Sequence, residues 1–229
     1  MNKTSSCIGL VLAANLLVAC GSSDSVEKTA PTCISPADPS CRIAVEAPSV
    51  VRWVAPATDA VSGGVSTAVV ERTSDGTCLS GKVDPGPGGT GWGALVIFEL
   101  ARTDDSVTVL APFDLKAKGV TKVRFNLSNP PSTGVLPQLV ELSSADCTTT
   151  PGCLSVFDGP PPVTTAGSVT LALGDFVTAE AQDTNKVSDP TISTAFQLLV
   201  APSSGTVVDY DFCIQNLQFL DAAGKEVSR

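Results

Sequence analysis

The sequence predicts an all-β protein, either a sandwich or a barrel of short strands. Residues 120–127 alternate between apolar and polar side chains, which places one face of a strand in the core and the other in solvent. Residues 94–98 are continuously apolar, as expected of a strand that is covered on both faces. Proline and glycine clusters separate such segments, and no stretch has a convincing helical period. Many short strands divided by turns are typical of sandwiches and barrels.

The expected strands follow one another from about residue 49 to near the C-terminus. Each combines β-branched or aromatic residues with flanking turn formers. The turn clusters lie at residues 84–89, 129–131 and 159–162. The strands are expected at residues 66–71, 92–100, 120–127, 136–142, 168–173, 194–201 and 207–220. The chain shows no internal repeat and no composition shift that would mark a second domain.

The first 20 residues have the pattern of an export signal that ends at a lipidation site. A polar start with Lys3 precedes the mostly apolar residues 8–19, a run shorter than the roughly 20 residues that a membrane-spanning helix needs. The end of the run, Leu17-Val18-Ala19-Cys20, resembles the lipobox of bacterial lipoproteins. In that family the cysteine receives a diacylglyceryl group, the signal is cleaved and the new N-terminus is acylated. The resemblance predicts a signal peptide over residues 1–19 and a membrane anchor at Cys20.

An ordinary secretory signal with a cysteine near its cleavage site is the alternative reading of this end. In Gram-negative lipoproteins, an aspartate directly after the lipidated cysteine resembles an inner-membrane retention signal. Residue 21 is glycine instead, which favours a location in the outer membrane of a Gram-negative bacterium. Residues 20–48 are rich in Ser, Pro, Thr and Ala and lack periodicity, so we expect a flexible tether there. The β-sandwich domain is then expected over residues 49–229.

Composition narrows the functions that the chain can have. The formal net charge is −9 and the sequence has no basic cluster, which argues against binding nucleic acid. The chain has no histidine, which excludes Ser-His-Asp and Cys-His catalysis and any zinc site with imidazole ligands. A hydrolase that uses carboxylates alone is still compatible with this composition. We therefore expect a protein that is not an enzyme.

Six cysteines follow Cys20, and an even number in an exported chain predicts disulfides. Six cysteines allow about 15 connectivities, so the sequence does not settle the pairing. Spacing favours two short loops, Cys33–Cys41 and Cys147–Cys153, each of which contains turn formers. Elimination then pairs Cys78 with Cys213, a long closure that is worth about 4–5 kcal/mol in the chain-entropy model.

Five short segments of the sequence, taken in order, carry a family resemblance. They are Asp75-Gly76-Thr77-Cys78-Leu79-Ser80-Gly81, Gly91-Trp92-Gly93-Ala94, Phe113-Asp114-Leu115-Lys116, Gly119-Val120-Thr121-Lys122-Val123-Arg124-Phe125 and Tyr210-Asp211-Phe212-Cys213-Ile214-Gln215-Asn216-Leu217. Together they resemble the galactose-binding-like jelly rolls found in lipoproteins of myxobacteria and related bacteria, which are akin to carbohydrate-binding modules. The resemblance covers about residues 60–220 and implies a disulfide-stabilised jelly-roll β-sandwich. It implies no particular ligand, because one fold serves many functions.

Candidate ligand-binding residues follow from the way carbohydrate modules bind sugar, by stacking it on aromatic rings and bonding its hydroxyl groups with polar side chains. The candidates are Trp53, Trp92, Arg124, Asn126, Gln197 and Gln215. Each has a structural alternative. The two tryptophans could instead pack the tether and the core, and the polar residues could line a solvated sheet face.

The resemblance also implies a structural calcium ion near the ends of the first and last strands, with Asp75, Asp209 and Asp211 as ligands. Calcium needs six to eight oxygen ligands, and no local acidic run supplies them. Our leading hypothesis is a lipid-anchored, non-catalytic module of the cell envelope that binds a polysaccharide or another glycan. The alternative is a structural or protein-interaction lipoprotein without a sugar site.

Overall fold

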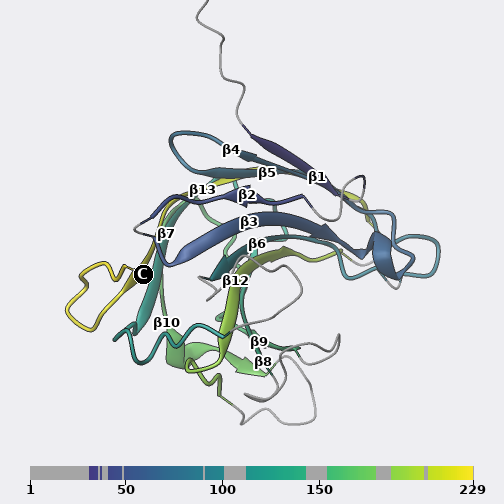
Figure 1. Ribbon diagram of the computed structural model, residues 1–229. Coiled ribbons are helices and arrows are strands. Elements are labelled where there is room, and N and C mark those ends of the chain that lie inside the picture. The colour runs from purple at the N-terminus through teal and green to yellow at the C-terminus, as the bar shows by residue number, and fades with distance from the viewer. Residues whose placement is uncertain are drawn as a thin grey trace, which may run out of the picture.

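Two antiparallel β-sheets form the molecule, one nested over the other (Figure 1). The computed structural model describes residues 31–35, 37, 41–47, 49–89, 91–100, 112–142, 154–178, 187–203 and 206–228. These residues contain two short 3-10 helices, η1 (Asp59–Ser62) and η2 (Leu173–Asp175), and no α-helix. Within the same residues, no helix has the length and hydropathy needed to cross a membrane.

The outer, six-stranded sheet lies over the top and left of Figure 1, and the seven-stranded sheet lies beneath it. The six-stranded sheet has the order β1 (Thr32–Ser35), β4 (Thr67–Arg72), β5 (Thr77–Val83), β13 (Val208–Leu220), β7 (Lys122–Ser128) and β10 (Gly167–Ala172). The seven-stranded sheet has the order β11 (Val177–Thr178), β9 (Leu154–Asp158), β8 (Leu136–Leu142), β12 (Ser193–Val200), β6 (Ala94–Leu100), β3 (Val51–Thr58) and β2 (Ile43–Ala44).

The chain crosses repeatedly between the sheets, and this gives the jelly-roll arrangement. β3, β6, β8 and β12 belong to the seven-stranded sheet, whereas β4, β7 and β13 belong to the other. Every strand pair is antiparallel, as in β5 with β13 and β6 with β12. The prediction of an all-β jelly-roll sandwich is confirmed.

The core lies between the two sheets and has an aromatic centre. Phe196 on β12 contacts four other rings, with centroid separations between 5.9 and 6.4 Å. Aromatic pairs in such geometries add about 0.5–1.5 kcal/mol each beyond the area that they bury. β7 alternates as the sequence predicts, because Val123, Phe125 and Leu127 are buried and the residues between them face outward.

The folded part of the chain begins before residue 49, which corrects the expected boundary of the tether. β1 pairs with β4 at the edge of one sheet, and β2 pairs with β3 at the edge of the other. Cys33 and Ile43 are buried in the core cluster. These strands are four and two residues long, too short for a periodic pattern, so the sequence did not reveal them. Residues 1–30, including the predicted signal peptide and Cys20, lie outside the described residues.

Two disulfides have the predicted pairing. Cys33 is bonded to Cys41, and the loop between them links β1 in one sheet to β2 in the other. Cys78 on β5 is bonded to Cys213 on β13, and the two residues are also direct partners in the strand register. Cys147 and Cys153 lie outside the described residues.

A fully buried carboxylate organises the loops at one end of the sandwich. Asp59 accepts hydrogen bonds from the backbone N–H groups of Ser66 and Gly93 and from the Ser66 hydroxyl, at 3.0 to 3.1 Å. Gly93 has φ +113°, and a Cβ there would collide with the Val200 carbonyl oxygen. The glycine at 93 beside Trp92 is therefore explained by close packing on another backbone.

Candidate ligand-binding surfaces

The structure divides five of the six predicted ligand-binding residues between the two opposite faces of the sandwich. Trp53 and Gln197 lie on the outer face of the seven-stranded sheet. Each is opposite a β6 residue that is next to the core residue Phe98, and Gln197 itself follows the core residue Phe196. Side chains alternate along a strand, so the neighbours of core residues point outward. Three others, Arg124, Asn126 and Gln215, lie on the outer face of the six-stranded sheet. Trp92 is half-buried in the loop before β6. The six residues therefore do not form one site.

A row of three polar side chains crosses the outer face of the seven-stranded sheet. Gln197 Nε2 donates to Gln138 Oε1 at 2.7 Å, and Gln138 Nε2 donates to Asp158 Oδ1 at 2.8 Å. The three residues are register partners on β12, β8 and β9. Both glutamines are only 7% exposed. We call Asp158, Gln138 and Gln197 the glutamine row.

Apolar side chains surround the glutamine row on the same face. Register places Ile97 beside Gln197, Leu199 and Leu136 on one side of the row, and Val140 on the other. Ile97, Leu199 and Leu136 are half-buried, so part of this floor is accessible. A few convergent polar groups within an apolar floor are typical of ligand-binding surfaces.

Trp53 stands at the edge of this floor. It lies on β3, two strands from Gln197 and two residues along, which ideal sheet spacing converts to about 10 Å across and about 7 Å along. The Arg52 guanidinium lies 5.9 Å from the centroid of the Trp53 ring. Glu99, the register partner of Trp53, accepts a hydrogen bond from Arg42 Nε at 2.9 Å. The half-buried indole therefore lies beside charged side chains on the same face of the sheet.

The glutamine row is chemically suited to hydroxyl groups. Each carboxamide has two N–H donors and an oxygen acceptor, and the bonds within the row use only part of this capacity. A linked row of hydrogen bonds in a partly desolvated place also holds its members in one orientation. The outer face of the seven-stranded sheet therefore combines fixed donors and acceptors with an apolar surface and one tryptophan.

The outer face of the six-stranded sheet is different in character. Arg124 donates through Nε and Nη2 to Gln218 Oε1, and Gln218 Nε2 donates to Glu226 Oε2 at 2.9 Å. A shallow hollow of about 260 Å³ lies beside these groups, lined by Arg124, Asn126, Ser168, Asn216 and Gln218. Its lining residues are all polar and include no aromatic ring, so it lacks the ring on which a sugar stacks.

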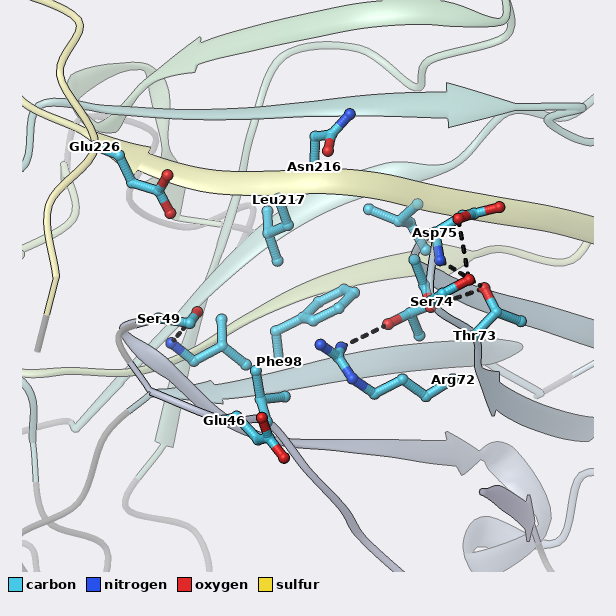
Figure 2. A pocket seen from close by; sticks show the side chains of 15 residues that line it. Glu46, Ser49, Arg72, Thr73, Ser74, Asp75, Phe98, Asn216, Leu217 and Glu226 are labelled. Carbon is cyan, nitrogen blue, oxygen red and sulfur yellow. Dashed lines mark hydrogen bonds between the residues drawn. The ribbon is translucent and has the colours of Figure 1, made fainter. Parts of the chain in front are cut away.

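A larger cleft of about 400 Å³ opens at one end of the sandwich (Figure 2). Its walls come from the segment before β3, the β4–β5 turn, the middle of β13 and the C-terminal segment. We call it the end cleft. It is lined by Val45, Glu46, Ser49, Val51, Arg72, Thr73, Ser74, Asp75, Gly76, Thr77, Phe98, Ile214, Asn216, Leu217 and Glu226.

A break in the regular pairing of β13 shapes the wall of the end cleft. The register of β13 with β7 shifts between Gln215 and Gln218. Within this irregularity Asn216 has φ +53°, in the left-handed region that asparagine tolerates better than most residues. Leu217, which follows it, packs against the core and lines the cleft.

Arg72 is the cation of the end cleft. Figure 2 shows its side chain extending into the cleft, with Glu46 beside it, Asp75 in the neighbouring turn and Glu226 on the far side of the cleft. Burial lowers the pKa of the Arg72 guanidinium, and the negative charge of Glu46 opposes that change. Its Nη1 donates to Thr77 Oγ1 at 3.4 Å, a long bond.

Sequence reasoning did not find the end cleft, because five segments distant in the chain build it, one of them β6 with Phe98. One signal was present in the sequence: β4 ends with Glu71 and Arg72 after an apolar run, and a charged side chain at such a strand end indicates a nearby partner. Of the cleft's lining, only Asp75 was a predicted site residue, and it was predicted as a calcium ligand.

The three aspartates predicted to bind calcium do not come together. Asp209 and Asp211 pair with Lys82 and Ser80 on β5, whereas Asp75 lies in the turn before Thr77, which is opposite Ile214. Across the described ranges, no group of three or more His, Cys, Asp or Glu residues could hold a metal ion. The strand register thus separates ligands that the family resemblance had grouped.

Comparison with known proteins gives a distant structural likeness. No protein-family description matches the sequence, and no curated protein matches it. The chain is similar to a family 11 carbohydrate-binding module from Clostridium thermocellum, solved in complex with a β-1,3-1,4-mixed-linked tetrasaccharide, with 11% identity and a TM-score of 0.47 over 74% of this chain and 89% of that one. A solution structure of CtCBM11 is similar with 9% identity and a TM-score of 0.28, over 84% and 99% of the two chains.

Proposed function

We propose that this chain is a non-catalytic carbohydrate-binding module that binds glycan on the outer face of the seven-stranded sheet. The observation that carries the proposal is the glutamine row within an apolar floor, with Trp53 at its edge. The amides and the carboxylate would bond sugar hydroxyls, and the floor and the indole would contact the apolar faces of the sugar rings. Fixed polar groups lose little entropy on binding, which favours specific recognition.

The charge of the protein favours a neutral glycan. The formal net charge is −9, and the glutamine row itself ends in the carboxylate of Asp158. An acidic polysaccharide would be repelled by this charge, whereas neutral hydroxyl groups would not. We therefore infer that neutral polysaccharides bind more tightly than uronic-acid or sulfated polymers of similar size.

The proposed module works by retention and has no catalytic role. The chain has no histidine, and the glutamine row contains one carboxylate, whereas glycoside hydrolysis ordinarily uses two on either side of the bond. Incubation of the purified protein with each polysaccharide that it binds should release no reducing ends. Release of reducing ends that is abolished by Asp158→Asn would show an enzyme instead.

We further propose that lipid on Cys20 holds the module to a membrane, and that this is the outer membrane of a Gram-negative cell. The support is the sequence Leu17-Val18-Ala19-Cys20 at the end of an apolar run. Labelling with a palmitate analogue and fractionation test this directly. The unaltered chain should carry label in the membrane fraction, whereas Cys20→Ala should carry none and leave that fraction.

Affinity electrophoresis against a panel of neutral and acidic polysaccharides tests the glycan proposal. At least one neutral polymer should retard the protein. Trp53→Ala and Gln197→Ala should abolish that retardation, whereas Arg124→Ala, on the opposite face, should leave it unchanged. If no polymer retards the folded protein, the alternative of a structural or protein-interaction lipoprotein replaces this proposal.

A further inference from the structure

The end cleft has binding features of its own, and they do not depend on the proposed glycan surface. Arg72 presents a planar guanidinium with several N–H donors, of which one makes the long hydrogen bond to Thr77. Burial disfavours the charged form of this group, so a partner that supplies negative charge and acceptors would stabilise it. The cleft therefore offers a site for a carboxylate.

Negative charge in the same cleft argues against a simple anion as the ligand. Glu46, Asp75 and Glu226 line the cleft with Arg72, so acidic groups outnumber the basic one. A purely anionic ligand would meet this excess of negative charge, and a purely cationic one would meet the half-buried guanidinium. A ligand with both charges satisfies both sets of groups.

The nearness of Arg72 and Glu46 points to an α-amino acid. Both side chains line the end cleft, Figure 2 shows Glu46 beside Arg72, and the charge of Glu46 acts on the guanidinium. In an α-amino acid the carboxylate and the ammonium are attached to the same carbon, which matches such adjacent partners. An extended molecule with distant charges does not.

The rest of the lining suits an apolar side chain. The half-buried Leu217 gives the end cleft accessible hydrophobic surface, and the buried side chains of Phe98 and Val51 also line it. A volume of about 400 Å³ lies within the usual range of small-molecule pockets. Such surface would bind an aliphatic or aromatic side chain by excluding water.

We propose that the end cleft binds a small zwitterion, a free α-amino acid with an apolar side chain, through Arg72 and Glu46. Its carboxylate accepts hydrogen bonds from the Arg72 guanidinium, and its ammonium lies beside Glu46. Its side chain contacts the half-buried Leu217. The site stands whether or not the outer face of the seven-stranded sheet binds glycan.

Isothermal titration of the purified protein with leucine and with phenylalanine, in both stereoisomers, tests this proposal. At least one amino acid should bind with a measurable Kd. N-acetylleucine, which lacks the ammonium, and leucinamide, which lacks the carboxylate, should bind at least about tenfold more weakly than leucine. Equal binding of the free and the blocked forms would overturn the zwitterion assignment.

Matched variants place the ligand in the cleft. Arg72→Gln and Glu46→Gln should each weaken binding at least about tenfold, and Arg72→Lys should restore part of the loss because it restores the charge. Arg124→Gln removes an arginine outside the cleft and should change nothing. A far-ultraviolet circular dichroism spectrum and a thermal midpoint like those of the parent show that a variant is folded. Absence of binding at millimolar leucine and phenylalanine, or full binding by folded Arg72→Gln, contradicts the proposal.

Discussion

The two sheets of this protein present outer faces of opposite character. On the seven-stranded sheet, Gln138 and Gln197 are 7% exposed and hydrogen-bonded to each other within an apolar floor. On the six-stranded sheet, Arg124 is exposed, and Cys78 is bonded to Cys213. Polar groups that are buried and ordered can recognise a ligand, whereas solvated ones mainly keep a surface soluble. The comparison therefore favours the outer face of the seven-stranded sheet as the proposed glycan surface, whereas a disulfide reinforces the six-stranded sheet.

Loss of the disulfide in the six-stranded sheet should produce the largest effect on stability. Cys78 and Cys213 are 135 residues apart, so the chain-entropy model gives about 5 kcal/mol for their bond. The double variant Cys78→Ala/Cys213→Ala should lose about that much free energy of unfolding in urea titration.

The other described disulfide provides the control for this prediction. Cys33 and Cys41 are 8 residues apart, and the same model gives about 2.5 kcal/mol for their bond. The double variant Cys33→Ala/Cys41→Ala should therefore be destabilised about half as much. Equal losses from the two pairs would mean that loop length does not govern their contributions.

Removal of the central amide of the glutamine row should affect both stability and binding. Gln138→Leu leaves Gln197 Nε2 and Asp158 Oδ1 without their partners, and an unpaired buried polar group costs about 1–3 kcal/mol. Thermal or urea unfolding should show a loss of about 2 kcal/mol, and glycan retention should disappear.

Asn126→Leu provides the matched change on the opposite face. Asn126 is a register partner of Gln215 on the six-stranded sheet, away from the glutamine row. The variant should alter stability by less than about 0.5 kcal/mol and leave glycan binding intact. If it destabilised the protein as much as Gln138→Leu, the contrast between the faces would be wrong.

Trp53→Ala should affect binding more than stability. The indole is half-buried at the edge of its floor, so truncation should cost about 1–2 kcal/mol, less than the 3–5 kcal/mol of a fully buried ring. Affinity for a neutral glycan should fall at least about tenfold. Titration calorimetry measures both parent and variant, and Trp53→Phe should retain part of the affinity because it keeps a ring.

In an alkaline titration, the phenol on the inner face of the six-stranded sheet should stay protonated at neutral pH and ionise only at high pH. The chain has one tyrosine, Tyr210, whose hydroxyl donates to the Thr67 carbonyl at 2.6 Å. Burial, followed by the charge of Asp59, raises its pKa. A raised pKa in the folded state stabilises the fold below the unfolded value of about 10, and that stability is lost as the pH rises above it.

Absorbance near 295 nm follows this single phenol. Tyrosinate should appear only above its ordinary range and together with the loss of native circular dichroism. A reversible titration near pH 10 in the native protein would show that the hydroxyl is accessible.

Local patterns in the sequence predicted most of the fold. The alternation at residues 122–127 and the apolar run at 94–98 identified β7 and β6, because strand period and burial are readable from neighbouring residues. β1 and β2 were missed, since their order depends on distant partners and on the Cys33–Cys41 bond. The folded segment consequently begins earlier than residue 49.

The candidate sites were less predictable, because a site depends on which strands become neighbours. Gln138 and Gln197 meet only because β8 and β12 are adjacent, and nothing local in the sequence indicates this pairing. Gln197 and Arg124 look equivalent as polar residues in β segments, yet they lie on opposite faces of the molecule. The end cleft combines five distant segments, so its Arg72 could not be assigned a role before the fold was known.

Side-chain amide resonances give the most direct test of glycan binding by the glutamine row. Titration of the ¹⁵N-labelled protein with an oligosaccharide of a neutral polymer that retards it should shift the side-chain amide signals of Gln138 and Gln197. Those of Asn126 and Gln215, on the opposite face, should stay in place. Shifts confined to Asn126 and Gln215, or shifts in neither pair, would contradict the account.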